Sequence, residues 1–243
     1  MYELITYEKK DGIALLTFDR PRVHNAISRA MRAEIVDALA AAAADETVGV
    51  LVLAANGKSF CAGRDMKEVG GNAGKPMAQV FEDYTLGKEF LDHFQSFGKP
   101  LIAAVNGYAL GYGTSIISYC DLVAAEESAV FGFPEIRNNI VPSTASVKTC
   151  ELVTPRKMAE MVLLGNRYTA AQAAEMGLVN CVVPDGSARD TALEWAAQLA
   201  GNDVMTNMLC KQYLQSLARP GYEARAIGTI GVLGMGYINK NNR

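Results

Sequence analysis

A stretch of 21 residues without a charged side chain, from Pro100 to Cys120, constrains this chain more than any other part of it. It reads PLIAAVNGYALGYGTSIISYC, so an apolar run at 101–105 is followed by glycines and then by a second apolar run. A bilayer helix is excluded, because asparagine, threonine and the glycines interrupt the run and bare backbone in lipid is costly. The pattern predicts a buried strand, a glycine-rich bend and a helix start. Since the first N–H groups of a helix lack partners within it, this bend is a candidate site for a negatively charged oxygen.

The overall composition narrows the class of protein. The 243 residues are half hydrophobic, with 26 acidic and 23 basic side chains, and no Lys/Arg cluster indicates a nucleic-acid partner. The first residues, MYELITYEKKDG, mix acids and bases without an apolar segment, so we expect no secretory signal and no membrane association. The five cysteines form no C-x-x-C pair and the two histidines have no metal-ligand spacing. We therefore expect reduced cysteines, a cytoplasmic location and no metal site.

Strand and helix signals alternate along the chain. Apolar or β-branched runs predict strands at 3–8, 12–18, 48–54, 101–105 and 179–183, with a strand pair within 121–131. Capping residues predict helices after Ser28, Thr154 and Thr169, and further helices are expected at 187–200 and 203–217. Repeated strand–loop–helix units indicate an α/β core with a helical C-terminal third.

Five segments resemble a known family. They are RPRVHNAIS (20–28), SFCAGRDMKE (59–68), KPLIAAVNGYALGYG (99–113), FGFPEI (131–136) and TAAQAAEMGLVNCVV (169–183). In this order, over residues 13–184, the chain resembles the crotonase, or enoyl-CoA hydratase/isomerase, superfamily. The resemblance implies a ββα spiral core that binds acyl-CoA at 1–184 and a helical trimerisation region at 185–243. It also implies an acyl-CoA thioester substrate, a homotrimer or dimer of trimers, and no cofactor beyond the coenzyme A of the substrate.

The resemblance assigns the oxyanion hole to the backbone N–H groups of Arg64 and Tyr112. Main-chain donors tolerate varied side chains, and preorganised donors stabilise charge that develops in a reaction. Tyr112 departs from the family's usual run of three glycines at 111–113. If this position needs a positive φ, tyrosine would cost about 1–2 kcal/mol and distort the hole.

The resemblance also implies a set of substrate contacts. Lys67 matches a lysine that contacts a CoA phosphate in relatives, although a solvated helix residue is an equally good interpretation. Asp65 is in addition expected to cap the helix that begins at Met66. The remaining contacts, which include backbone lining the CoA groove, are expected at Ala26, Ala62, Met66 and Gly111.

Glu135 is the expected acid/base residue. It follows Phe131, Phe133 and Pro134, and apolar neighbours raise the pKa of a carboxyl group. Typical hydratases of this family carry a second glutamate where this chain has Ser115, which could bind a water but is a poor base. A single glutamate favours a double-bond isomerase or another enolate reaction such as decarboxylation. A hydratase would need a replacement carboxylate, for which the candidates are Glu82, Asp83, Glu89 and Asp92.

Two alternatives come from other classes of protein. A serine hydrolase would use Ser115 as its nucleophile and His24 or His93 as its base, although GTSII lacks the G-x-S-x-G turn. A non-catalytic CoA-binding subunit is favoured if Tyr112 blocks the pocket.

Overall fold

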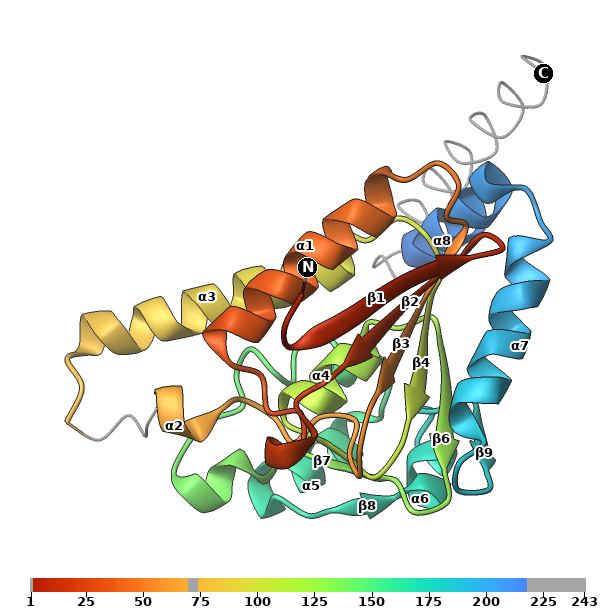
Figure 1. Ribbon diagram of the computed structural model, residues 1–243. Helices are drawn as coiled ribbons and strands as arrows, with labels where there is room; N and C mark the ends of the chain where they lie inside the picture. Colours follow the sequence, from red (N-terminus) through yellow and green to blue (C-terminus); the bar gives the residue numbers. More distant parts are fainter. Residues whose placement is uncertain (1, 70–73, 218–243) are drawn as a thin grey trace.

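The computed structural model describes residues 2–69 and 74–217 (Figure 1). Its strands are β1 (Ile5–Lys10), β2 (Ile13–Phe18), β3 (Val50–Ala55), β4 (Leu101–Val105), β5 (Tyr108–Leu110), β6 (Leu122–Glu126), β7 (Val130–Gly132), β8 (Tyr168–Thr169) and β9 (Cys181–Val183). Its α-helices are α1 (Arg29–Ala44), α2 (Met66–Val69), α3 (Met77–Gln95), α4 (Tyr112–Ser118), α5 (Pro155–Leu164), α6 (Ala170–Glu175), α7 (Ala188–Ala200) and α8 (Val204–Leu217). Short 3-10 helices are η1 (Pro21–Val23), η2 (Pro134–Asn138) and η3 (Thr149–Glu151).

Six strands form a large sheet in the order β1-β2-β3-β4-β6-β9. β1 and β2 are antiparallel and joined by a tight turn, whereas every other pair in this sheet is parallel. A smaller sheet has the order β5-β7-β8. The predicted strand pair within 121–131 is therefore wrong in one respect: both strands exist, but β6 and β7 join different sheets. Val130 begins β7 by donating its N–H to the Gly107 carbonyl beside β5 instead of turning back on β6.

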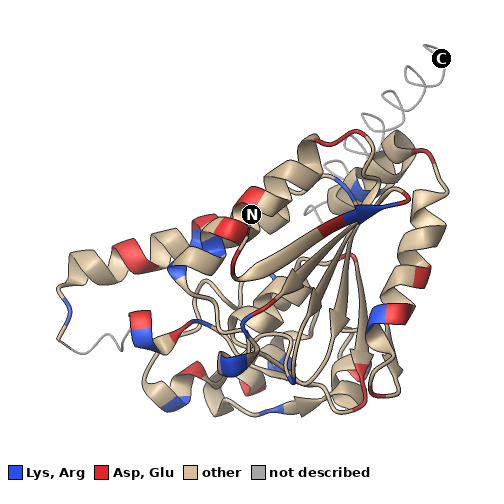
Figure 2. Cartoon of the chain, in the orientation of Figure 1, with Lys and Arg blue, Asp and Glu red and all other residues tan. Residues whose placement is uncertain are grey.

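The central strands are apolar throughout because helices cover both faces of the large sheet (Figure 1). Alternate side chains of a strand point to opposite faces. Leu51 and Leu53 of β3 join the main core that α1 covers, whereas Val50, Val52 and Ala54 pack with α7. β2, β3 and β4 carry no charged residue, whereas charges lie on helices, on loops and on the edge strand β1 (Figure 2). These strands confirm the expected buried, parallel core.

α7 covers its face of the sheet with small residues. Ala188, Ala192 and Ala196 recur every four residues, so one stripe of the helix approaches β3 and β4 closely. This helix thus packs within the chain, although it lies beyond residue 184. Residues 218–243 lie outside the described part, and the division into 1–184 and an oligomerisation region at 185–243 stays a prediction.

The helix starts follow their capping residues. Ser28 accepts a hydrogen bond from the Met31 N–H, and Thr154 accepts one from the Lys157 N–H. Thr169 and Gln172 form the expected capping box. None of the described helices is long and apolar enough to span a membrane.

Candidate active site

Two loops lie side by side at one edge of the large sheet, where neighbouring parallel strands β3 and β4 end. The Cys61 N–H donates to the Tyr108 carbonyl at 2.8 Å, and the Leu110 N–H donates to the Cys61 carbonyl at 2.9 Å. A Cβ added to Gly113 would overlap the Cys61 carbonyl oxygen, so glycine permits this close approach. The glycine-bearing loops at 59–67 and 107–113, whose paired residues are 48 positions apart in the sequence, thus meet in space.

The hydrogen bonds between the two loops end at Cys61 and Leu110. The backbone amides of Arg64 and Tyr112 lie a few residues further along each loop. Gly63 and Gly111 change the direction of the two loops at this point, with φ of +109° and +55°. A Cβ built on Gly63 would lie 3.9 Å from the Tyr112 nitrogen, which places the bends next to each other. Over residues 2–69 and 74–217, neither the Arg64 nor the Tyr112 N–H donates a hydrogen bond. Two unpaired donors are therefore available at adjacent bends, as an oxyanion hole requires.

Tyr112 carries no backbone strain. The positive φ belongs to Gly111, and Tyr112 is the first residue of α4. Its side chain is only 2% exposed and stacks on Phe90 at a centroid distance of 5.9 Å. The concern that tyrosine would strain the hole is therefore wrong, because the glycine before it makes the turn and the ring packs into the core.

A small pocket of about 100 Å³ opens beside these bends. It brings together the predicted site residues Ala62, Arg64, Met66, Gly111 and Glu135. Among the described residues that line it, Glu135 is the only one with a carboxylate. The other lining residues are Gly63, Pro134, Asn138 and Ile140.

Glu135 stands on η2, directly behind the buried Phe133. A Cβ added to Gly111 would lie 2.7 Å from its Oε1, so the carboxyl group rests against the glycine bend. Its Oε2 is buried and has no hydrogen-bond partner within the described part of the chain. Burial raises the pKa of Glu135 to about 7, and the positive charge of Arg64 opposes that rise. A carboxyl group with this pKa can both accept and return a proton near neutral pH.

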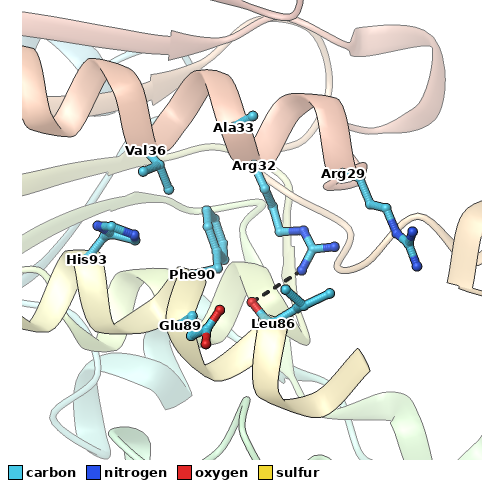
Figure 3. Close-up of a pocket in the computed structure, with 8 residues that line it drawn as sticks. All are labelled: Arg29, Arg32, Ala33, Val36, Leu86, Glu89, Phe90 and His93. Carbon is cyan, nitrogen blue, oxygen red and sulfur yellow. Dashed lines mark hydrogen bonds between the residues drawn. The ribbon is translucent and has the colours of Figure 1, made fainter. Parts of the chain in front are cut away.

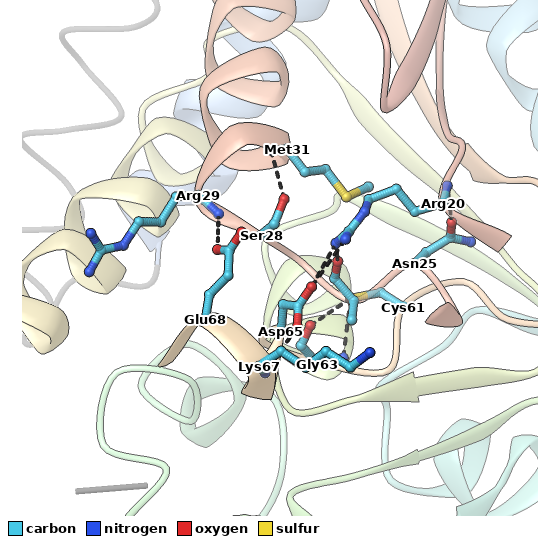
Figure 4. A network of polar contacts seen from close by, with 11 residues as sticks. Arg20, Asn25, Ser28, Arg29, Met31, Cys61, Gly63, Asp65, Lys67 and Glu68 are labelled. Atoms are coloured by element: carbon cyan, nitrogen blue, oxygen red, sulfur yellow. Dashed lines mark hydrogen bonds and ion pairs between the residues drawn. The ribbon is translucent and has the colours of Figure 1, made fainter. Parts of the chain in front are cut away.

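Asp65, Lys67 and Ala26 do not line this pocket. The Asp65 Oδ1 accepts the Lys67 N–H at 3.1 Å, which is the expected helix cap, and its Oδ2 pairs with the Arg20 guanidinium at 3.1 Å (Figure 4). Lys67 is exposed on α2. Contacts of these three residues with substrate stay predictions.

Ser115 is fully buried in α4. Its Oγ lies 2.5 Å from the Ala145 carbonyl oxygen and 3.0 Å from that of Gly111, and it is absent from the pocket lining. The hydroxyl is thus engaged by backbone acceptors. Neither histidine reaches it: His24 Nδ1 is 2.9 Å from Ser59 Oγ, and His93 lies on the surface between α1 and α3 (Figure 3). The geometry gives a serine hydrolase no support.

The proposed replacement carboxylates on α3 lie elsewhere. Asp83 pairs with Lys75 at 2.9 Å and with Arg29 at 3.3 Å, and Asp92 pairs with Lys88. Glu82 and Glu89 are exposed, and none of the four lines the pocket of Glu135. No group of three or more His, Cys, Asp or Glu side chains suited to a metal ion occurs in the described ranges.

Asn25 is a positioning residue that sequence reasoning missed. Its side chain is fully buried, accepts the Arg20 N–H at 2.7 Å, and donates to the carbonyls of Asn56 and Ser59 at 3.0 and 2.7 Å. The residue itself adopts φ +53°, which asparagine tolerates better than most side chains. It thereby holds the 20–28 segment against the loop that supplies Arg64. The sequence signal that could have indicated this role is an asparagine between Pro21, in a turn, and Ser28, which caps a helix.

Comparison with known proteins agrees with this geometry. A family model described as enoyl-CoA hydratase/isomerase matches residues 8–229. The 2,3-dehydroadipyl-CoA hydratase of Escherichia coli is 37% identical over 216 residues, covering 88% of this chain and 82% of that protein. A probable enoyl-CoA hydratase of Rhizobium meliloti is 35% identical over 215 residues, covering 87% and 80%.

Solved structures show the same fold. An enoyl-CoA hydratase from Mycobacterium smegmatis superposes with a TM-score of 0.89 at 28% identity, covering 96% of this chain and 91% of that one. The enoyl-CoA hydratase from Bacillus anthracis gives a TM-score of 0.88 at 27% identity, covering 96% and 90%. The paired glycine bends, the half-buried glutamate, the family model and these relatives agree, and the chain belongs to the enoyl-CoA hydratase/isomerase family.

Proposed function

We propose that this enzyme of CoA thioesters moves the double bond of an enoyl-CoA through an enolate, with Glu135 as its single proton carrier. The observation that carries the proposal is the pocket itself. Among its described lining residues only Glu135 has a carboxylate, and that carboxylate rests against the bend that precedes the free Tyr112 amide.

The proposed reaction begins at the thioester carbonyl. Its oxygen accepts hydrogen bonds from the N–H groups of Arg64 and Tyr112, which stabilise the negative charge that forms when a proton leaves C2. Ionised Glu135 removes that proton and returns it to C4, so a 3-enoyl thioester becomes the conjugated 2-enoyl thioester. Each amide is worth roughly 2.7–4 kcal/mol to such a reaction, the range found when one donor of an oxyanion hole is removed.

One carboxyl group is enough for this transfer. The same group is base in the first step and acid in the second, and a pKa of about 7 balances the two roles. The proposed reaction uses only Glu135 and two main-chain amides, so it requires no resident cofactor, coenzyme A being part of the substrate. Lys67 and the backbone near Ala26 and Ala62 are proposed to contact the coenzyme. A cytoplasmic location fits this substrate and stays a proposal.

Hydration is the second candidate, and the names of the relatives favour it. The Escherichia coli and Rhizobium meliloti proteins are both called hydratases. Addition of water to a double bond uses one carboxylate to deprotonate water and another to protonate carbon. Ser115 stands where the second is expected, and its hydroxyl is already engaged by carbonyl oxygens.

Two substrates separate the candidates. We expect 3-enoyl-CoA to gain the absorbance of the conjugated thioester, and 2-enoyl-CoA to keep that absorbance in water. A hydratase would instead remove the absorbance of 2-enoyl-CoA, and that result with no change of 3-enoyl-CoA would overturn the isomerase assignment while leaving the enolate site in place.

A further inference from the structure

Within the described ranges the side chain of Arg64 forms no salt bridge, although its charge acts on Glu135 and its amide is proposed for the oxyanion hole. Its guanidinium carbon lies 5.7 Å from the centre of the Tyr112 ring, and the residue lines the pocket of Glu135. Across residues 2–69 and 74–217, the guanidinium makes no ion pair and no hydrogen bond. In this part of the chain the Arg64 guanidinium is therefore held by its cation–π contact with Tyr112, and its five N–H donors are available to a ligand.

A second guanidinium close by is also unmatched. Arg32 of α1 is half-buried and points toward α3, where its nearest acceptor is the Leu86 carbonyl at 3.4 Å (Figure 3). It forms no salt bridge with any described residue. Burial lowers the pKa of Arg32, and repulsion from Arg64 and Arg29 lowers it further while the nearby Tyr112 opposes this. Both guanidinium groups lie near Tyr112. Arg64 stands over its ring, and Arg32 donates to the carbonyl of the residue before Gly87, against which the Tyr112 hydroxyl packs.

Two of the neighbouring acids are already engaged, and a third, Glu89, is exposed in the pocket that Arg32 lines. Asp83 is shared by Lys75 and Arg29, and a Glu68 carboxylate oxygen accepts the Arg29 N–H at 2.7 Å. Glu135 is held protonated below about pH 7. Among the described residues that line the pocket of Glu135, Arg64 is the cation and Glu135 the acid, so positive charge exceeds negative charge while Glu135 holds its proton, and an anionic ligand would then balance Arg64.

Coenzyme A itself carries phosphates that could pair with Arg64. The position of the Arg64 guanidinium therefore decides whether it faces these phosphates or the acyl group. The Arg64 amide and the Tyr112 amide are where the thioester oxygen is proposed to bind. The Arg64 guanidinium returns over the Tyr112 ring, whereas the phosphates of coenzyme A are separated from the thioester by the whole pantetheine arm. The unmatched charge therefore faces the acyl group.

We propose that Arg64, supported by Arg32, binds a carboxylate at the far end of the acyl group, so that the substrate is a thioester of a dicarboxylic acid. This inference rests on the proposed function, because it places the acyl group by the oxyanion hole. A planar guanidinium suits a carboxylate because it can donate two parallel hydrogen bonds.

The test is the binding of unreactive saturated thioesters, measured by calorimetry in pairs of equal length. Hexanoyl-CoA is compared with adipyl-CoA, and octanoyl-CoA with suberyl-CoA, whose carboxylates are too far from the thioester to close a five- or six-membered ring. We expect the carboxylated member of at least one pair to bind roughly tenfold more tightly, as charge-assisted hydrogen bonds allow. Arg64→Gln keeps its backbone amide and should reduce this preference to about twofold or less, with a smaller reduction for Arg32→Gln and partial retention for Arg64→Lys.

Arg29→Gln is the matched control, because Arg29 lies one turn from Arg32 on α1 but is exposed and paired with Asp83. Its preference should equal that of the wild type. Equal affinities within both pairs in the wild-type enzyme would overturn the inference. The inference would also be overturned if Arg64→Gln weakened the binding of free CoA and of all four thioesters by the same factor. The guanidinium would then bind a phosphate of the coenzyme.

These failures differ from a failure of the proposed function. If wild-type enzyme isomerises 3-enoyl-CoA but shows no preference within a pair, only the dicarboxylate inference falls. If no thioester binds at all, the proposed function falls with it. Thermal melting of each variant verifies that it is folded, and half-buried Arg32 supplies a change that leaves the two glycine bends untouched.

Discussion

The properties of Glu135 come from its surroundings more than from its own chemistry. A glutamate in water is ionised at neutral pH, but here both the apolar residues before it and the glycine bend exclude solvent. The apolar residues of FGFPE predicted the direction of its pKa, and the resemblance to the family singled out the residue itself. The unpaired Oε2 could not be foreseen, because it depends on which loops close over the side chain.

Replacement of Glu135 by glutamine should reduce kcat/KM for 3-enoyl-CoA by 10²-fold or more, the range of general acid–base catalysis. In the wild type, kcat/KM should rise with pH and level off above about pH 7, because the reaction starts from the ionised carboxylate. Initial rates between pH 5 and 9 measure both. A glutamine variant with a normal rate would remove Glu135 from the mechanism.

The same carboxyl group should make stability depend on pH. Its pKa is raised on folding from 4.5 to about 7, so the folded protein retains a proton that the unfolded chain releases in this interval. The contribution of Glu135 to stability is therefore complete below pH 4.5 and is lost as the pH rises through about 7. We expect Glu135→Gln to melt higher than the wild type at pH 8, with a smaller difference at pH 5. Equal differences at both pH values would contradict the raised pKa.

At the scale of elements, the contact between α3 and α4 depends on a glycine, Gly87, at which any side chain would collide with Tyr112. A Cβ on Gly87 would overlap the Tyr112 hydroxyl oxygen, whereas the next ring atom, Cζ, would be 3.6 Å away. The hydroxyl itself is buried without a partner in the described structure. Glycine within a helix thus marks a place where another element packs closely.

Gly87→Ala should lower the free energy of unfolding by about 1–3 kcal/mol, the usual cost of overpacking. Tyr112→Phe alone should cost little, since it removes an unsatisfied hydroxyl. The double variant should recover much of the loss, because the overlapping oxygen is gone. Denaturant unfolding of all four proteins measures this coupling, and strictly additive changes would show that the helices do not meet as described.

Asn25 joins two loops that are distant in the sequence. Asn25→Ala would leave the carbonyls of Asn56 and Ser59 without their donor and should destabilise the protein by roughly 2–4 kcal/mol, as unpaired buried groups do. Asn139→Ala is the control, since Asn139 also has a positive φ of 57° but is exposed. Its replacement should cost only the backbone preference, about 1 kcal/mol. Similar losses at both positions would deny Asn25 its role as a clamp.

At the scale of the whole molecule, large apolar side chains lie on the surface of α5 and of the segment that follows η2. Val141, Leu163 and Leu164 are 66%, 65% and 58% exposed. Exposed apolar groups of this kind mark contact surfaces. They support, without establishing, the proposed homotrimer or dimer of trimers.

Light scattering on the purified chain should give a mass of three or six copies. A double change, Leu163→Asp with Leu164→Asp, should lower that mass if α5 lies in the contact, because charge at an apolar interface opposes association. Arg156→Asp, at the other end of the same helix, serves as the control for charge alone. A wild-type monomer would contradict the assembly.

Sequence reasoning succeeded where the pattern is local and failed where distant segments decide. The strands at 48–54 and 101–105, the capping residues and the two glycine bends were confirmed within a few residues. The pairing of β7 was missed, because its partner β5 is chosen by the close approach of Gly107 and Val130. The burial of Ser115 was missed for a similar reason, since its acceptor Ala145 lies 30 residues away.

Gly111 supplies the positive φ of the bend and Tyr112 supplies the amide, and this division affects how the enzyme could diversify. Because a glycine makes the bend and the peptide nitrogen of its successor is the proposed donor to the carbonyl, this role does not depend on the successor's side chain. The same holds for Gly63 and Arg64. Selection can exchange the side chain at position 64, and that at position 112 together with its partners in the core, and with them the acids that are accepted, while the proposed means of activating a thioester is inherited unaltered.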